Sequence, residues 1–258
     1  MTDPALSGAV GPSPSPGPGP APLSTALSDR SGEAGVHSPE IGDPLTKALL
    51  SLHSISADAP EGAVTRRSPS RREEILDGAA ALFAERGYHG SSLRDISRRV
   101  GISHPGMLHH FASKDALLGA VIDRLEQHAQ GLIDATGEVK RSPQALLAAL
   151  AGVWNPTTHL MTLLATLSAE TVNPEHPGRF RIARLRLVHE HVIEQVLASF
   201  QERGLLVEGA DPSFLARTTV SVMLSLSVRE NSVRALQKNG DGDPVQDLQQ
   251  LVRSFLRD

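Results

Sequence analysis

The chain has 258 residues, of which 40% are hydrophobic, so it is long enough to bury one or two cores. It contains no cysteine, which excludes disulfides, thiolate catalysis, cysteine-ligated zinc and thiol redox sensing. The formal net charge of −4 argues against a chain coated in basic residues, although this charge is unevenly distributed along the sequence.

Residues 1–66 are predicted to form a disordered tail rich in Pro, Gly and Ser. Residues 1–65 hold ten of the eighteen prolines, and proline interrupts both helices and sheets. Such a segment has too little apolar surface to offset the entropy of ordering it. A short amphipathic helix at residues 45–52, fraying or docked on a partner, is an alternative for one stretch. Val64 offers an alternative translation start, which would leave the tail out of the protein.

The first predicted helix covers residues 71–86. Apolar residues recur there at helical spacing, and Gly87 follows the last basic residue as a cap. A second helix is expected to begin after Ser91 or Ser92. Asp95 lies three residues after Ser92 and completes an approximate capping box, with Asp where Glu or Gln is usual.

Residues 93–111 have the pattern of a helix-turn-helix. Apolar residues at i, i+3 and i+7 give the first helix one buried face, and Gly101 can end it in the left-handed conformation. Ser103 or His104 can then cap a second short helix, with Pro105 in its first turn. A helix pair joined by such a short turn places its second helix in the major groove of DNA.

The basic residues are concentrated around this motif. Residues 66–128 carry ten Lys or Arg against eight Asp or Glu, whereas residues 1–65 carry two against seven. Because nucleic-acid affinity depends on local neutralisation of phosphates, this small excess suffices only if the basic groups share one face.

The remaining pattern is also helical. A fourth helix is expected to begin after Ser113, and proline or glycine breaks then separate five more. These five are predicted at residues 144–154, 157–171, 179–203, 213–238 and 245–256. Because no run has the alternation of a strand, the predicted fold class is all-α. We expect a three-helix domain plus a linking helix at residues 67–128, and a second helical domain at residues 129–258.

Several function classes lack support in the sequence. The longest apolar run, residues 145–154, is half of what a bilayer crossing needs, and residues 1–20 do not resemble a signal peptide. We therefore expect a cytoplasmic protein with no membrane partner. No nucleophile elbow, P-loop or dinucleotide fingerprint is present, and no acidic or His cluster has ligand spacing. We expect no enzymatic activity, no cofactor and no metal.

Four linked segments resemble the DNA-binding domain of the TetR family of bacterial regulators. They are residues 75–88, 92–103, 108–111 and 113–118. The resemblance implies a transcriptional repressor that binds a palindromic operator in double-stranded DNA as a homodimer. It also implies that residues 129–258 sense an unknown small-molecule effector and form the dimer. An adaptor or structural protein of the same fold, without specific DNA binding, is the alternative.

The resemblance also implies which residues contact DNA. Six of them would present the recognition surface: Ser103, His104, Pro105, Gly106, His109 and His110. Arg94 and Lys114 would meet phosphates. A metal pair at the two adjacent histidines is disfavoured, because neighbouring helical residues point about 100° apart. Leu108 stands where the family most often has a tyrosine that touches a phosphate. Arg98 and Arg99 are equally well interpreted as solvated or as phosphate contacts.

The second domain offers weaker predictions. Five apolar residues are candidates to line an effector pocket, with ordinary core packing as the alternative: Trp154, Met161, Leu164, Phe180 and Leu187. The arginines within residues 179–186 spread over more than one helix face and favour a solvated surface over an acidic-ligand site. His189 and His191 face different directions, so they form no pair. The helices at residues 213–238 and 245–256 are expected to form the dimer interface, since the former is apolar nearly all round.

Overall fold

The computed structural model describes residues 70–237 and 242–257, which contain ten α-helices and one 3₁₀-helix. In chain order they are α3 (Arg71–Arg86), α4 (Leu93–Arg99), α5 (His104–His110), α6 (Lys114–Asp134), α7 (Thr136–Val139), α8 (Pro143–Ala151), α9 (His159–Glu170), α10 (Arg179–Glu202), α11 (Pro212–Ser232), η2 (Val233–Leu236) and α12 (Pro244–Arg253). The only β-type pairing in this part is an isolated bridge between Leu206 and Leu256, so the all-α class is confirmed. The predictions for residues 1–66, including the short helix and Val64, lie outside the described residues.

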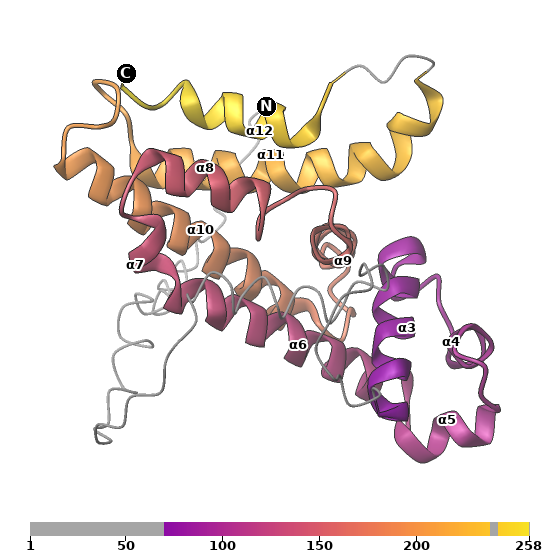
Figure 1. Ribbon diagram of the computed structural model, residues 1–258. Helices are drawn as coiled ribbons and strands as arrows, with labels where there is room; N and C mark the ends of the chain where they lie inside the picture. The colour runs from indigo at the N-terminus through magenta and orange to yellow at the C-terminus, as the bar shows by residue number, and fades with distance from the viewer. Residues whose placement is uncertain (1–69, 238–241, 258) are drawn as a thin grey trace, which may run out of the picture. The chain divides into compact units, whose positions relative to one another are not determined.

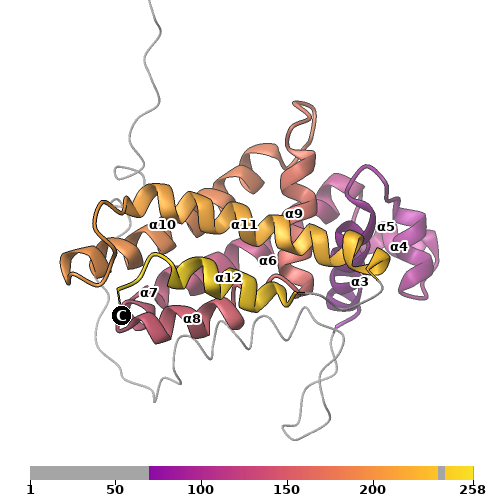
Figure 2. The ribbon, with the colours of Figure 1, turned by 90° about the horizontal axis from the view of Figure 1, so that it is seen from above.

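Helices α3, α4 and α5 lie together at one end of the helical part, and α6 leads from them along the other helices (Figure 1). Helices α9, α10 and α11 pack on one another, and α12 lies against α8 and α11 (Figures 1 and 2). Helix α9 also packs against α3. Helices α6 and α9 therefore both pack against α3 and support the group formed by α3, α4 and α5.

Serine side chains determine where the N-terminal helices begin. Ser70 starts α3 with a complete capping box, in which its hydroxyl accepts from the Glu73 N–H and its own N–H donates to the Glu73 carboxylate. Ser92 caps α4 and Ser103 caps α5, which decides between the alternatives left open by the sequence. The capping box predicted at Asp95 is incomplete. Its carboxylate accepts from the Ser92 hydroxyl, because a side chain one methylene shorter than Glu does not reach the backbone N–H.

Three features differ from the predicted helices. Helix α6 is continuous from Lys114 to Asp134 and so runs across the predicted boundary between residues 128 and 129. The four-residue helix α7 was not predicted. Helix α11 ends at Ser232 and gives way to η2. Near this end, Asn231 donates to the Ser227 carbonyl and Ser232 to the Val228 carbonyl, so side chains compete for the acceptors of the last turn.

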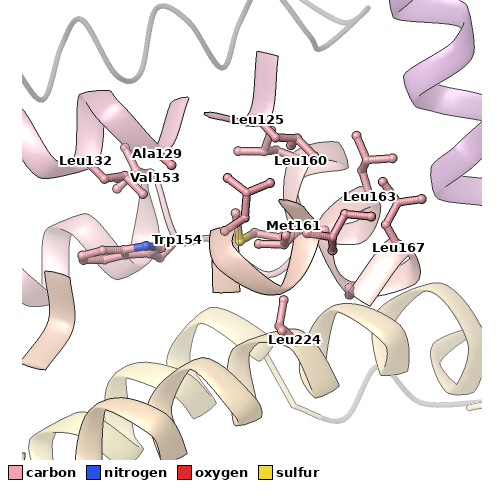
Figure 3. Close-up of a cluster of buried hydrophobic side chains, with 14 of the residues drawn as sticks. Leu125, Ala129, Leu132, Val153, Trp154, Leu160, Met161, Leu163, Leu167 and Leu224 are labelled. Atoms are coloured by element: carbon pink, nitrogen blue, oxygen red, sulfur yellow. The ribbon is translucent and has the colours of Figure 1, made fainter. Parts of the chain in front are cut away.

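The buried apolar side chains form one connected cluster across the described helices. Its central part, drawn in Figure 3, brings residues of α6 against the segment before α9 and against α9 itself. The labelled members are Leu125, Ala129, Leu132, Val153, Trp154, Leu160, Met161, Leu163, Leu167 and Leu224. Because α6 contributes to this cluster, it is packed into the core formed with the helices of the second half of the chain. The division into residues 67–128 and 129–258 stays a prediction.

Candidate nucleic-acid interface

The turn between α4 and α5 is set by one glycine. Gly101 has φ 69°, a left-handed conformation that other residues adopt only with strain. The Ile102 N–H then donates to the Ser97 carbonyl at 3.0 Å, and the partly buried Ile102 side chain packs against the core. The chain thus reverses within a few residues and presents Ser103 at the start of α5.

Helix α5 is attached to the protein through one edge only. Met107 is fully buried and Phe111, four residues later, is 4% exposed, so both lie on the same side of the short helix. Leu108 is 43% exposed, and both His109 and His110 are exposed. The remaining surface of α5 is therefore free to meet a partner.

The structure places the predicted DNA-binding residues in two groups. The exposed ones are Arg94, Ser103, Pro105, His109 and His110. His104, Gly106 and Lys114 are partly buried. The two histidine rings stand edge to face with centroids 5.6 Å apart, and within the described residues no group of three or more His, Asp or Glu is arranged to hold a metal ion.

Gly106 lies in the first turn of α5, where its N–H donates to the Ser103 hydroxyl at 3.1 Å. A Cβ at this position would come within 3.2 Å of that oxygen, so a side chain here would press on the cap. The cap therefore gives a structural reason for the glycine at this position.

Lys114 has a structural role that the sequence did not reveal. Its ammonium donates to the carbonyl oxygens of Tyr88 and Ser91, each at 3.0 Å, and lies 4.0 Å from the centroid of the Tyr88 ring. The first residue of α6 therefore holds the turn between α3 and α4. The predicted phosphate contact of Lys114 stays a prediction, and only part of its hydrogen-bonding capacity remains for it.

The arginines of α4 differ in their surroundings. Arg98 lies 3.3 Å from Asp95 and Arg99 lies 2.7 Å from Glu85, so both belong to surface ion pairs. Arg94 is exposed and makes no ion pair within the described part of the chain. Of the three, Arg94 is therefore the cation whose charge is available to a phosphate without breaking an existing contact.

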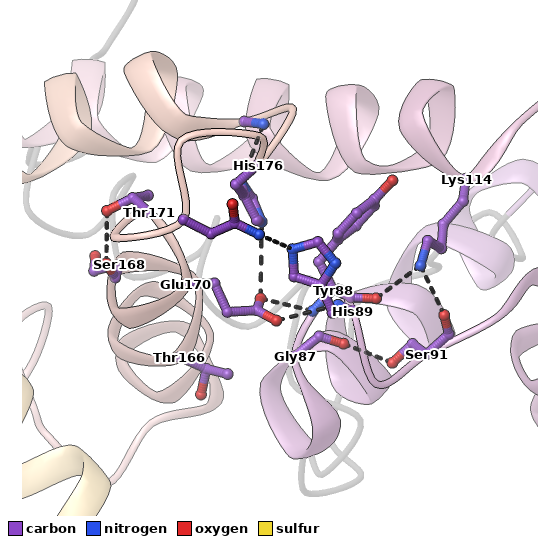
Figure 4. A network of polar contacts seen from close by, with 12 residues as sticks. Gly87, Tyr88, His89, Ser91, Lys114, Thr166, Ser168, Glu170, Thr171 and His176 are labelled. Carbon is purple, nitrogen blue, oxygen red and sulfur yellow. Dashed lines mark hydrogen bonds and ion pairs between the residues drawn. The ribbon is translucent and has the colours of Figure 1, made fainter.

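A polar cluster joins the end of α3 to the end of α9 and to the loop that follows α9 (Figure 4). The Glu170 carboxylate, at the end of α9, accepts from the backbone N–H of Tyr88 at 2.7 Å and of His89 at 3.1 Å. Gly87 lies directly beneath it with φ 72° and ψ 173°, and a Cβ there would come 2.5 Å from a Glu170 oxygen. We call these four residues the Glu170 junction.

Further contacts surround the Glu170 junction. The buried His176 ring packs edge-on against Tyr88, and its Nε2 lies 3.8 Å from the Glu170 carboxylate, too far for a hydrogen bond. Burial lowers the pKa of His176, although the nearby carboxylate acts in the opposite direction. The Tyr88 hydroxyl donates to Asp115, and burial together with this bond raises the pKa of Tyr88. Residues from α9, from the following loop and from α6 therefore meet at the end of α3.

The predicted effector-pocket residues separate into two kinds. Trp154, Met161 and Leu164 are buried in the core, as either interpretation of the sequence required. Phe180 and Leu187 are 78% and 45% exposed, so their assignment to an interior pocket was wrong. Both lie on the outer face of α10, and a helical apolar pattern does not distinguish a face covered by the same chain from one left uncovered.

Of two buried histidines, His128 was missed from the sequence and His189 was considered only as a partner of His191. His128 on α6 and His189 on α10 are each 2% exposed, and the Trp154 indole N–H donates to His189 Nδ1 at 3.0 Å. A sequence signal for the first existed, since His128 continues the stripe of Val121, Leu125 and Leu132 at helical spacing. A polar residue within such an apolar stripe predicts a buried polar side chain, which makes it a candidate for a functional role.

A short helix anchored by two buried side chains, exposed elsewhere and entered through a glycine turn, defines a helix-turn-helix protein. A family model described as "Bacterial regulatory proteins, tetR family" matches residues 75–121, which include all of α4 and α5. None of the helices within residues 70–237 and 242–257 has the length and apolarity needed to cross a bilayer.

Comparison with known proteins extends the match beyond this motif. The chain is 45% identical over 192 residues to the HTH-type transcriptional repressor AcnR of Corynebacterium diphtheriae, covering 72% of this chain and 92% of AcnR. It is 40% identical over 84 residues to the repressor KstR2 of Mycobacterium tuberculosis, a match that spans only 42% of KstR2. The crystal structure of a TetR-family transcriptional regulator from Agrobacterium tumefaciens has a TM-score of 0.59 at 20% identity, covering 73% of this chain and 98% of that one. The chain belongs to the TetR family.

Proposed function

We propose that this chain is a sequence-specific transcriptional repressor that binds a palindromic DNA operator as a homodimer and is released by a small-molecule effector. The single observation that carries this proposal is the outward face of α5, comprising Ser103, Pro105, His109 and His110. The buried Met107 anchors α5 in the core. One such helix reads only a few base pairs, so two copies about 34 Å apart would supply the specificity that a regulator needs. The names of AcnR and KstR2 support repression as the direction of control.

Two kinds of contact with DNA are proposed. His109 and His110 would read base edges from the major groove, whereas Arg94 would neutralise a phosphate from the preceding helix. The exposure of all three side chains and the absence of an ion pair at Arg94 within the described residues support this division. Lys114 would contribute through the position of the α3–α4 turn, with its own phosphate contact as an additional proposal.

Fluorescence anisotropy with duplexes from the region upstream of the protein's own gene tests DNA binding. We expect binding that weakens steeply with salt, and Arg94→Ala should reduce the slope against log salt by about one. Arg257→Ala removes the same charge after α12, where the Arg257 backbone N–H pairs with the Leu205 carbonyl, and should leave the slope unchanged. His109→Ala should weaken operator binding by about 1–3 kcal/mol and relax sequence preference at one position.

The result that would refute the proposal is equally specific. If the purified protein binds no duplex at low ionic strength, the DNA-binding function fails and an adaptor role becomes the better account. If it binds DNA but both Arg94→Ala and His109→Ala bind as the unchanged protein does, the assigned contacts are wrong while the function stands.

The homodimer is proposed to form through the outer faces of α10 and α11. On α10 the exposed residues recur at i, i+4, i+7 and i+11: Phe180, Arg184, Leu187 and His191. On α11 an exposed stripe follows the same periodicity: Phe214, Arg217, Ser221, Ser225, Val228 and Ser232. The two helices pack on each other, and the Arg186 guanidinium donates to the Ser221 hydroxyl at 2.8 Å, so the stripes are neighbours. Two copies of such a face would meet as an isologous four-helix interface.

In this proposal α10 takes the place of α12, the helix that was expected from the sequence to lie at the interface together with α11. Leu248 and Val252, on the apolar side of α12, are 0% and 2% exposed against α8 and α11 of the same chain. Little apolar surface of α12 is therefore left for a partner. The sequence pattern alone could not separate burial within one subunit from burial between two.

Analytical ultracentrifugation of Leu187→Glu tests the interface. This change replaces an apolar side chain in the proposed contact by a carboxylate that would have to lose its hydration, so the variant should sediment as a monomer at concentrations where the unchanged protein is dimeric. Leu236→Glu is the matched control, since Leu236 is 84% exposed and lies on η2 outside both stripes. Dimers in both variants would refute the α10–α11 interface, and monomers in both would indicate a general effect of the added charge.

A further inference from the structure

His128 is the most unusual side chain in the interior of the second half of the chain. It lies on α6 with 2% exposure, and both ring nitrogens are buried without a hydrogen-bond partner in the described structure. A neutral imidazole carries one donor and one acceptor, so both capacities are unused. Burying a polar group in this way costs free energy that an apolar residue of similar size would avoid.

The surroundings of His128 contain polar groups but no charge. The centroids of the His128 and His189 rings lie 6.4 Å apart, and His189 Nδ1 already accepts a hydrogen bond from the Trp154 indole N–H. Burial alone lowers the pKa of His128 to about 4, with no contribution from a charged side chain. Burial, together with the neighbouring His128, lowers the pKa of His189 to about 3. Both rings are therefore neutral at pH 7.

Three parts of the chain converge at this cluster. His128 comes from α6, His189 from α10, and Trp154 from the segment between α8 and α9. On α6, His128 lies between Leu125 and Leu132, which belong with Trp154 to the buried apolar cluster of Figure 3, so the side chains around the imidazole are mainly apolar. A molecule bound here would have mainly apolar contacts, and His128 would offer it a hydrogen bond at either ring nitrogen.

We propose that His128 is the hydrogen-bonding group of the effector site, and that the effector is an uncharged, mainly apolar molecule carrying a hydroxyl or carbonyl group. Such a group would satisfy one of the two ring nitrogens, and the apolar part of the molecule would match the surrounding side chains. A charged molecule would find no counter-ion, and an ion without a partner is strongly disfavoured in a buried apolar site. This inference rests on the proposed function for its regulatory meaning.

The position of His128 connects such a site to the DNA-binding unit. His128 lies fourteen residues after Lys114 on the same continuous helix, which corresponds to about 21 Å along the axis. Lys114 holds the α3–α4 turn through the Tyr88 and Ser91 carbonyls. A ligand that prefers a shifted α6 would therefore favour a different placement of α4 and α5, and so lower operator affinity in proportion to that preference.

Three probes of similar ring size test the inference: phenol, toluene and benzoate. They offer a neutral hydroxyl, no polar group and a charge, respectively. NMR spectra of full-length protein labelled with ¹⁵N-histidine should give a phenol-induced shift of the His128 ring nitrogens. In titrations at millimolar concentrations, phenol should bind about fivefold to tenfold more tightly than toluene, as expected for one additional hydrogen bond. Benzoate should not bind.

Variants separate a binding role from a merely structural one. His128→Leu should fold at least as stably and lose the preference for phenol over toluene, whereas His128→Gln, which retains hydrogen-bonding capacity, should keep part of it. His159→Leu is the matched control, because His159 is exposed at the first position of α9. If either His128 variant fails to fold, the ring-nitrogen shifts of the unchanged protein decide the question.

The inference is overturned if phenol causes no shift of the His128 nitrogens, if phenol and toluene bind equally, if benzoate binds as tightly as phenol, or if folded His128→Leu keeps the preference. In the first case an internal water would be the better explanation of His128. Operator binding of the protein without any probe is measured separately, so failure of this inference is distinguishable from failure of the proposed function.

Discussion

The conformation of Gly87 and the position of Glu170 predict an energetic coupling that can be measured. Gly87 ends α3 with φ 72° and ψ 173°, a region of backbone space that is essentially restricted to glycine. Gly87→Ala should therefore cost about 1–3 kcal/mol of folding free energy from backbone strain alone. The added Cβ would also come 2.5 Å from a Glu170 oxygen, so the carboxylate must move.

Displacing the carboxylate has its own cost. Glu170 accepts from two backbone N–H groups, at 2.7 Å from Tyr88 and at 3.1 Å from His89, and its side chain is 19% exposed. Hydrogen bonds to charged groups contribute about 1.5–3 kcal/mol each, and partial exposure brings the pair to roughly 2 kcal/mol in total. Gly87→Ala should thus lower the free energy of unfolding by about 3–5 kcal/mol in the unchanged background.

Urea unfolding followed by circular dichroism measures this in a double-mutant cycle with Glu170→Ala. In the Glu170→Ala background, Gly87→Ala should cost only the strain, so the two changes should fail to add by about 2 kcal/mol. Gly137→Ala is the control, since a Cβ there meets nothing within 4 Å and the residue lies in a helix. Additive costs would refute the contact between the carboxylate and residue 87, and a cost below about 1 kcal/mol for Gly87→Ala would refute the backbone conformation.

Three further outcomes are expected. His128 alone should lower stability by about 3 kcal/mol as the pH falls from 6.5 to 4, because unfolded histidine binds protons that buried His128, with a pKa of about 4, does not; urea unfolding of His128→Leu should retain less of the protein's pH dependence. Met107→Ala should cost about 2–5 kcal/mol and weaken operator binding more than Leu108→Ala, its exposed neighbour. Ser113→Ala should cost about 1 kcal/mol in thermal or urea unfolding, whereas Ser113→Gly should cost only a few tenths; equal losses would argue against the cap.

The sequence predicted the parts of this fold that local rules determine. Serine caps, the glycine turn at Gly101 and the periodic apolar residues located α3 to α6 and the main helices after them. The exposure of His109 and His110 also agrees with the expected outward face of α5.

The contacts that the sequence did not reveal all join distant segments. Glu170 meets Tyr88 across 82 residues, and Trp154 meets His189 across 35, and no periodicity encodes either pair. Nothing in the sequence indicated that the Lys114 ammonium has partners within the protein, because its acceptors are backbone carbonyls and no residue type identifies them. Phe180 was misplaced because an apolar residue has the same helical spacing whether its own chain covers it or not.

The way α5 is attached also bears on how such a protein could change its target. The fully or nearly buried side chains that tie this helix to the interior are Met107 and Phe111, so substitutions at the exposed His109 and His110 remove little packing. If His109 and His110 read bases as proposed, new side chains at these positions would alter which bases are preferred at almost no cost to folding. Exchange of the outward residues between relatives is therefore a practical route to redirecting such a regulator to a different promoter.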